Sequence, residues 1–219
     1  MKIAAFETAG EWCSVALWLD GEVRAIEVRA GQRHGELVLP MLETLLAQAR
    51  FAIRDLQAVA FGAGPGSFTG LRIACGIAQG LAFARGLPAC GVSTLEALAE
   101  ESGARRVVAC LDARLGEVYY SALEKDGARW REVVTARCVP PSQAPRPPGS
   151  GWIGCGSGFA AYGDMGLDRV YPKIHPGAAA VARLAAPRLA AGEGVDAARI
   201  APVYLRDKVA LTTQERRNR

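Results

Sequence analysis

Residues 64–72 read Gly64-Pro65-Gly66-Ser67-Phe68-Thr69-Gly70-Leu71-Arg72, and they lie between an apolar run, 56–62, and a segment rich in Ala, Gly, Ile and Leu, 71–85. This order predicts a strand, a tight glycine-rich loop and a helix. Glycines let backbone N–H groups come close to a ligand or to another part of the chain, and a helix N-terminus favours negative charge. Ser67 and Thr69 are both suitable N-caps for the helix. The loop is therefore either a site for a phosphate-sized anion or a rigid structural elbow.

The loop does not match the common phosphate-binding motifs. A Walker A loop requires a lysine after its last glycine, whereas Leu71 and Arg72 follow Gly70. The dinucleotide-binding fingerprint requires G-x-G-x-x-G, whereas the run from Gly64 has one more residue before its last glycine. The anion site and the structural elbow therefore remain equal alternatives.

The first half of the chain begins with apolar runs that predict three strands. Asp20-Gly21 stands between two of these runs and is typical of a two-residue hairpin turn. Apolar residues at helical spacing follow. The pattern predicts strands at 2–7, 12–19, 22–29 and 56–62, and helices at 35–49, 71–85 and 94–101.

The second half begins in the same way. Its pattern predicts strands at 106–111, 117–123 and 128–135. Glu7 matches Asp112 at an offset of 105, and Asp20-Gly21 matches Asp126-Gly127 at an offset of 106. Duplication of one strand-hairpin-helix unit accounts for both matches. It predicts an α/β protein with two lobes.

The duplication places the first lobe at 1–104 and the second lobe at 105–219. In the second lobe, the proline-rich stretch 140–149 predicts a surface loop, because proline does not fit helix interiors or central strands. An alanine-rich helix is predicted at 178–191, with a kink or break at Pro187.

Composition favours a globular protein in a reducing compartment. Of the 219 residues, 50% are hydrophobic and 22% are charged, and no apolar run reaches the roughly 18 residues of a membrane span. The first residues lead directly into strand-like sequence without a signal-peptide pattern, so we expect a cytoplasmic protein. The cysteines form no C-x-x-C pair and are expected to be buried free thiols. They are Cys13, Cys75, Cys90, Cys110, Cys138 and Cys155.

Charge is unevenly distributed between the two halves. Residues 1–104 carry 8 Lys and Arg against 11 Asp and Glu, whereas 105–219 carry 18 against 11. The basic half could favour RNA, but an arginine-rich surface in contact with solvent is the simpler interpretation. The basic C-terminal tail, 215–219, is expected to be frayed.

The helices at 35–49 and 71–85 carry more small and apolar residues than one buried face needs. Since glycine costs a helix about 0.5–1 kcal/mol relative to alanine, its use inside 71–85 indicates close packing. This packing is either on the chain's own sheet or on a partner helix. The small residues form two adjacent faces, Ala74, Ala78 and Ala82 on one, and Gly76, Gly80 and Ala84 on the other.

Four stretches together resemble the TsaB (YeaZ) family over nearly the whole chain. They are Gly64 to Arg72, His34-Gly35-Glu36-Leu37-Val38-Leu39-Pro40, Asp112-Ala113-Arg114-Leu115-Gly116-Glu117-Val118-Tyr119, and Pro202-Val203-Tyr204-Leu205-Arg206. The resemblance implies the two-lobed actin/Hsp70-like ATPase (ASKHA) fold. In catalytic members of this fold, an acid after the first strand of each lobe helps to place metal and phosphate. Glu7 and Asp112 hold these positions, and the family usually has Asp where this chain has Glu7.

The resemblance also implies a non-catalytic role beside TsaD. TsaD transfers a threonylcarbamoyl group to the adenosine next to the anticodon, in tRNAs that read codons beginning with A. The implied partners are TsaD in a heterodimer, the small ATPase TsaE, a second copy when the chain is alone, and tRNA through the complex. No tightly bound cofactor is implied, and ATP or ADP would bind in complex with the partners. Pairing uses the two first-lobe helices, with Leu37, Met41, Leu45, Ala74, Ala78 and Ala82 as the expected interface.

The chain lacks residues that a catalytic relative needs. TsaD is a metalloprotein with two histidines on one helix, whereas His34 and His175 lie in different lobes. We therefore expect no metal site. Ser67 has no evident base beside it and does not fit the G-x-S-x-G elbow, so we assign no catalytic residue. Two enzyme alternatives remain: an ATPase or kinase with the two acidic residues and the glycine-rich loop at the phosphates, and a peptidase.

Overall fold

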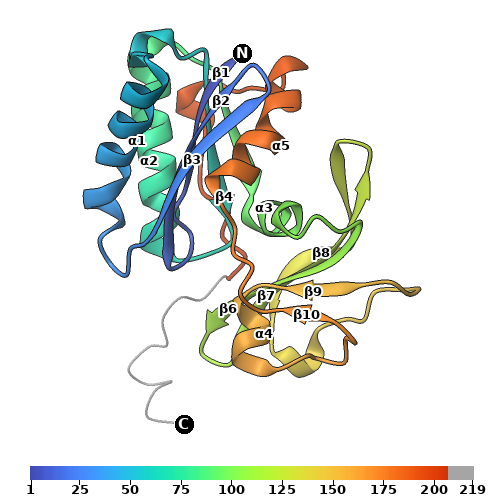
Figure 1. The fold of residues 1–219 in the computed structure, drawn as a ribbon. Helices are drawn as coiled ribbons and strands as arrows, with labels where there is room; N and C mark the ends of the chain where they lie inside the picture. The colour runs from blue at the N-terminus through green and yellow to red at the C-terminus, as the bar shows by residue number, and fades with distance from the viewer. Residues whose placement is uncertain (207–219) are drawn as a thin grey trace.

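Each half of the chain forms one five-stranded sheet (Figure 1). The first sheet has the strand order β3-β2-β1-β4-β5, and the second has the order β8-β7-β6-β9-β10. In both sheets the first three strands along the chain pair antiparallel to one another. The last two strands run parallel to the first strand of their half, β1 or β6. The matching order confirms the predicted duplication and the two-lobed actin/Hsp70-like ATPase fold. The computed structural model describes residues 1–206.

The elements lie close to their predicted positions. The strands are β1 (Lys2–Glu7), β2 (Trp12–Leu19), β3 (Glu22–Arg29), β4 (Ala58–Gly64), β5 (Ala89–Ser93), β6 (Arg106–Arg114), β7 (Glu117–Asp126), β8 (Arg129–Val139), β9 (Ile153–Cys155) and β10 (Val170–Tyr171). The α-helices are α1 (His34–Ala49), α2 (Phe68–Arg85), α3 (Thr94–Glu101), α4 (Ser157–Tyr162) and α5 (Ala178–Ala190). Short 3-10 helices are η1 (Ile53–Asp55), η2 (Pro141–Gln143) and η3 (Ala197–Arg199).

Local sequence explains where several elements begin and end. Asp20 and Gly21 adopt φ values of 51° and 110° at the turn between β2 and β3, as a two-residue hairpin of this kind requires. Helix α2 begins earlier than predicted because Ser67 is its N-cap and accepts a hydrogen bond from Gly70 N. It ends at Gly86, whose φ of 62° forms a left-handed C-cap.

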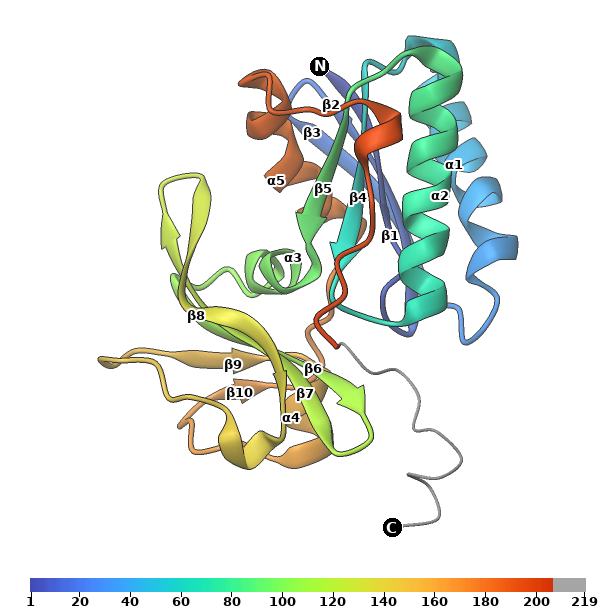
Figure 2. The same ribbon diagram turned by 180° about the vertical axis from the view of Figure 1, so that it is seen from behind.

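The first sheet is buried on both faces. Helices α1 and α2 cover one face, and α5 covers the other (Figures 1 and 2). Phe6, Val15 and Phe61 pack in one core cluster with α1 and α2, while Ile3 and Ala5 face the cluster that contains α3 and α5. Burial on both faces explains why β1 and β4 are almost continuously apolar.

The last α-helix of each half packs against the sheet of the other half. Helix α3 contacts β6 and β7 as well as β4 and β5, and α5 contacts all five strands of the first sheet. After α5 the chain continues along the first lobe, where Val203 N donates a hydrogen bond to Ala63 O at 2.7 Å. The predicted division at 104/105 therefore separates the two sheets, but residues 178–204 of the predicted second lobe lie on the first.

The second lobe has less helix than the first. Between β8 and β9, where the first lobe has α1, the chain forms η2 and the predicted proline-rich loop, 140–149. Helix α5 continues through Pro187 to Ala190, so the predicted break is absent. Pro187 leaves the carbonyl of Arg183 without its usual intrahelical donor, but the helix continues for only three residues beyond it.

The predicted basic tail, 215–219, lies outside the described residues. No helix within residues 1–206 is long and apolar enough to cross a bilayer. The surface-loop prediction for 140–149 is consistent with the structure, since most of its residues are exposed or half-buried.

Candidate functional site

The glycines of the loop are enclosed by the chain's own backbone. A Cβ atom on Gly70 would lie 2.0 Å from the carbonyl oxygen of Thr8, and one on Gly66 would lie 2.5 Å from Ala9 Cβ. A Cβ atom on Gly64 would lie 2.4 Å from a carbonyl oxygen of the C-terminal segment. These distances are too short for any side chain. Glycine is therefore required where the loop crosses two other parts of the chain.

The polar groups of the loop are also used within the protein. Ser67 N donates to Ala9 O at 2.8 Å, and Thr8 Oγ1 donates to Gly70 O at 2.7 Å. Gly70 N donates to Ser67 Oγ at 3.4 Å. These bonds hold the start of α2 against the turn that follows β1. Of the two interpretations of the loop, this arrangement favours the structural elbow.

The outer side of the loop carries an aromatic and cationic cluster. The Arg72 guanidinium lies 3.8 Å above the Phe68 ring, and Arg72 Nε donates to Tyr204 Oη at 3.1 Å. The Phe68 and Tyr204 rings are 5.5 Å apart. Thr69 is exposed beside them, whereas Pro65 is buried. The motif thus also fastens the last described segment to α2.

Glu7, at the end of β1, is enclosed by the protein. Its Oε1 accepts a hydrogen bond from Ala9 N at 2.8 Å, and its Oε2 accepts one from Thr94 Oγ1 at 3.3 Å. Gly62 on β4 leaves the necessary space, since a Cβ atom there would lie 1.9 Å from Glu7 Oε2. Burial raises the pKa of Glu7 from 4.5 to about 7, because the ionised carboxylate loses its hydration.

Asp112, near the end of β6, is held by neighbouring polar groups. The Arg114 guanidinium lies 3.1 Å from Asp112 Oδ2, and Arg114 N donates to Asp112 Oδ1 at 2.8 Å. The Tyr162 hydroxyl donates to the same Oδ1 at 3.4 Å. The charge of this carboxylate is therefore balanced by the chain's own cation.

A cleft of about 950 Å³ separates the two lobes beside Asp112. The glycine-rich loop, the turn after β1, helix α4 and the linker 172–176 contribute to its walls. Asp112 lines the cleft, but Glu7 does not. The structure therefore does not bring both acidic residues to the cleft surface. The cleft has a volume typical of ligand sites, and its charged walls comprise Arg29, Arg114, Lys173 and Arg206 against Glu11 and Asp112.

A stacked pair at the edge of the cleft links the lobes. The rings of Trp12 and His175 are 4.3 Å apart and inclined by 8°. His175 Nε2 lies 3.3 Å from Glu27 Oε2, and Glu27 Oε1 accepts a hydrogen bond from Ser14 Oγ at 2.8 Å. Ser14 Oγ in turn accepts one from Ala178 N, at the start of α5. The sequence predictions missed this network, because its members are distant in sequence and no local pattern brings them together.

We expect this network to make stability depend on pH. The hydrogen bond to Glu27 raises the pKa of His175 above its ordinary value of 6.5, and Glu101 acts in the same direction. A raised pKa means that the contribution is complete below pH 6.5 and is lost as pH rises through the folded-state value. With both side chains about one-third exposed, the expected loss is about 0.5–1 kcal/mol.

Urea unfolding at about pH 6 and about pH 8.5 measures this loss. The free energy of unfolding of the wild type should fall between the two pH values relative to that of His175→Gln. Glu27→Gln serves as the matched control, because it leaves the imidazole but removes its partner. An unchanged wild-type pH dependence in His175→Gln would contradict the assignment.

Most of the predicted partner-interface residues are buried in the protein's own core. Met41 and Leu45 on α1 are 7% and 1% exposed. On α2, Ala74, Ala78 and Ala82 face the first sheet and are at most 1% exposed. These five positions are therefore corrected to core positions, because their small or apolar side chains let the two helices lie close to the sheet. Leu37 is half-buried.

The second small face of α2 has the opposite environment. Gly76, Gly80 and Ala84 are exposed, and a Cβ atom on either glycine would meet nothing within 4 Å. Phe83, which lies between Gly80 and Ala84 on the same helix, is 82% exposed. The sequence showed this stripe, but only burial distinguishes it from the alanine stripe beside it.

Residues 1–206 contain no group of three or more His, Cys, Asp or Glu side chains that could hold a metal ion. His34 is buried at the start of α1, and its Nε2 has no hydrogen-bond partner within this part of the chain. The six cysteines are free thiols. Burial raises the pKa of Cys110 to about 12, so this thiol is a poor nucleophile at neutral pH.

Comparisons with known proteins identify close relatives. The family model of TsaD, tRNA N6-adenosine threonylcarbamoyltransferase, matches residues 28–149. The tRNA threonylcarbamoyladenosine biosynthesis protein TsaB of Escherichia coli K12 is 38% identical over 96% of both chains. The protein of the same name from Haemophilus influenzae is 35% identical over 95% of both chains.

Two solved structures from Pseudomonas aeruginosa are also similar. YeaZ aligns with a TM-score of 0.89 and 37% identity, covering 93% of this chain and 99% of its own. A protein described as similar to peptidase YeaZ aligns with a TM-score of 0.89 and 36% identity, covering 94% of this chain and 99% of its own. The similarity extends over both lobes.

Proposed function

Because the chain belongs to the TsaB (YeaZ) family, we propose that it acts in the biosynthesis of tRNA threonylcarbamoyladenosine as a non-catalytic partner of a TsaD-type transferase. TsaD transfers the threonylcarbamoyl group to the adenosine next to the anticodon, in tRNAs that read codons beginning with A. This chain binds TsaD through the outer face of α2 and supports the active complex. The exposed glycine face of that helix is the observation that carries the proposal.

Two exposed glycines on the outer face of α2 destabilise the helix, although packing within the isolated chain does not require them. A Cβ atom added at Gly76 or Gly80 would meet no other atom within 4 Å, so an alanine would fit at either position. Each glycine nevertheless lowers the stability of the helix by about 0.5–1 kcal/mol relative to alanine. Phe83 exposes 82% of its surface on the same helix. A partner helix explains both features, since it can approach closely at the glycines and cover the phenylalanine. The same face serves a homodimer when TsaD is absent.

The two acidic residues of the ATPase-like scaffold support a non-catalytic role. Glu7 is buried with both carboxyl oxygens hydrogen-bonded, and Asp112 is paired with Arg114. Neither carboxylate is free to hold a magnesium ion beside a phosphate without local rearrangement. The chain therefore contributes a binding surface, and the partner contributes the chemistry.

The remaining partners follow from this assignment. The chain works in the cytoplasm and contacts TsaE and tRNA as part of the complex. It binds no cofactor tightly when alone. The N–H groups of Ser67 and Gly70 already have acceptors within the chain, so ATP or ADP occupies the cleft only when a partner supplies further contacts.

Reconstituted transfer tests the proposal. Threonylcarbamoyl transfer to tRNA is measured with TsaD, TsaE and the adenylate-forming enzyme of the same organism, with and without this chain. We expect transfer to require the chain, and the chain alone neither to hydrolyse ATP nor to modify tRNA. Full transfer without the chain would refute the partner role, and ATP hydrolysis by the chain alone would favour the ATPase alternative.

A surface variant tests the proposed interface directly. Gly80→Arg places a long charged side chain on the exposed glycine face and should reduce TsaD binding and transfer by about tenfold or more. Ala190→Arg is the matched control, because Ala190 is also exposed on a helix of the first lobe but lies on α5. Normal binding of TsaD by folded Gly80→Arg would place the interface elsewhere.

A further inference from the structure

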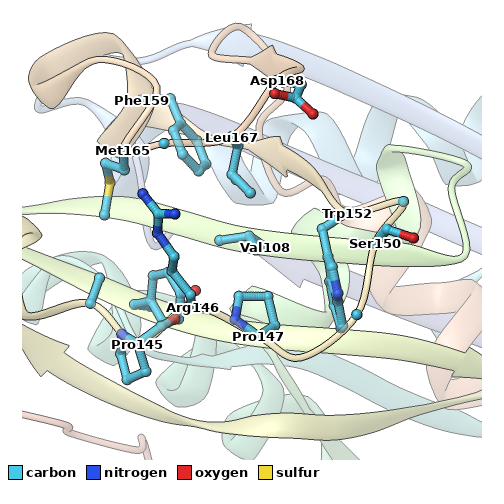
Figure 3. Close-up of a pocket in the computed structure, with 15 residues that line it drawn as sticks. Val108, Pro145, Arg146, Pro147, Ser150, Trp152, Phe159, Met165, Leu167 and Asp168 are labelled. Carbon is cyan, nitrogen blue, oxygen red and sulfur yellow. Dashed lines mark hydrogen bonds between the residues drawn. The ribbon is translucent and has the colours of Figure 1, made fainter.

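The second lobe has a pocket where the first lobe has a helix. In the duplicated strand order, α1 connects β3 to β4, whereas the corresponding segment from β8 to β9 is η2 followed by the proline-rich loop. Between this loop, β6 and α4 lies a cavity of about 260 Å³ (Figure 3). The missing helix therefore leaves a hollow over the second sheet.

Two hydrogen bonds hold the proline-rich loop above the pocket. The Tyr120 hydroxyl, on β7, donates to Pro145 O at 2.6 Å. Trp152 Nε1 donates to Pro148 O at 2.9 Å. These anchors lie on either side of Arg146, and the adjacent proline rings restrict the backbone further. The position of Arg146 is therefore largely fixed before any ligand binds.

The Arg146 side chain forms one wall of the pocket. Figure 3 shows it rising from the loop toward Met165. Its guanidinium packs against Gly166, where a Cβ atom would lie 2.5 Å from Arg146 Nη2. Gly166 also has a φ of 80°, which favours glycine. Arg146 is exposed to solvent, and within residues 1–206 its guanidinium has neither an ion pair nor a hydrogen bond to a protein acceptor.

The rest of the pocket offers apolar surface. Val108 and Phe159 form the base of the pocket but are only 1% and 4% exposed, so the apolar surface open to a ligand comes from the half-buried Leu167, Trp152 and Met165. The Trp152 N–H is already used to anchor the loop. The Asp168 carboxylate points away on the other side of Leu167 from Arg146 (Figure 3). The open part of the pocket thus combines half-buried apolar side chains with one solvent-exposed guanidinium.

We propose that this pocket binds an organic carboxylate with an apolar body. The carboxylate pairs with Arg146, whose planar guanidinium matches two carboxylate oxygens. The apolar body lies on Leu167, Met165 and Trp152. A cavity of about 150 Å³ holds a benzene molecule, so 260 Å³ has room for a ring and a short chain. This site is separate from the proposed TsaD surface on α2.

Ligand titration followed by NMR or calorimetry on the full chain tests the proposal. The first probe is 4-phenylbutyrate, and its neutral analogue is 4-phenylbutanamide. The second pair is a short peptide ending in Leu-Phe with a free carboxylate or with an amidated C-terminus. Since a hydrogen bond to a charged group contributes more than a neutral one, we expect each acid to bind about tenfold to hundredfold more tightly than its amide.

Variants assign the binding to the pocket. Arg146→Gln should remove the preference for the acid, whereas Arg137→Gln, which changes an exposed arginine on β8, should keep it. Binding of 4-phenylbutyrate supports a free small acid as the ligand, and binding of the peptide alone supports a C-terminal carboxylate. Equal binding of acid and amide, no saturable binding of either probe, or an unchanged preference in Arg146→Gln would each overturn the proposal. These measurements use the isolated chain, so they do not depend on TsaD.

Discussion

Gly70→Ala is expected to lower the free energy of unfolding by about 3–4 kcal/mol. The new Cβ atom would lie 2.0 Å from Thr8 O, and this atom belongs to the backbone and cannot rotate away. The start of α2 must therefore move from the turn after β1. That movement also weakens the hydrogen bond from Thr8 Oγ1 to Gly70 O. Urea unfolding followed by circular dichroism measures the change.

Gly76→Ala is the matched control on the same helix. A Cβ atom at Gly76 meets nothing within 4 Å, so the substitution should stabilise the isolated chain by about 0.5–1 kcal/mol through helix propensity. Opposite changes in the free energy of unfolding for Gly70→Ala and Gly76→Ala would separate the effect of close packing from that of helix propensity. If Gly70→Ala is as stable as the wild type, the loop is not a tight elbow, and the anion-site interpretation regains its support.

The two interpretations of the loop could not be separated from its sequence. Both require glycines before a helix and an N-cap such as Ser67. What distinguishes them is the group opposite each glycine, which here is Thr8, Ala9 or the segment at 203. Those groups come from elsewhere in the chain, the last of them more than 100 residues away. Local sequence does not report which distant backbone arrives there.

The sheets were predictable because their signals are local and repeated. Asp20-Gly21 specifies one hairpin, and the matching Asp126-Gly127 made the duplication and thus the two-lobed fold evident. The exchange of α3 and α5 between the sheets was not predicted, since amphipathic patterns show that a helix face is buried but not against which sheet. The same limit led to the misassignment of Ala78 as an interface residue, because small faces suit both a sheet and a partner helix.

Glu7→Gln is expected to remove a stability change of about 3 kcal/mol across the neutral pH range. Burial raises the pKa of the Glu7 carboxyl from 4.5 to about 7 in the folded chain. Between these values the unfolded chain releases its proton while the folded chain keeps it. The contribution of Glu7 to wild-type stability should therefore fall as pH rises from 4.5 to 7 and change little above 7. Glutamine has the same shape and does not titrate.

Urea unfolding over this range compares the wild type, Glu7→Gln and Glu43→Gln, which removes an exposed carboxyl on α1. The difference between wild type and Glu7→Gln should grow with pH, whereas the difference from Glu43→Gln should stay nearly constant. A wild type that parallels Glu7→Gln would mean that Glu7 is ionised in the folded state. A charged carboxylate at the end of β1 would then need a cation beside it, which would strengthen the case for nucleotide and metal in the first lobe. A loss of stability with rising pH that the wild type shows and Glu7→Gln lacks would instead support a scaffold whose acidic residue has become part of the core.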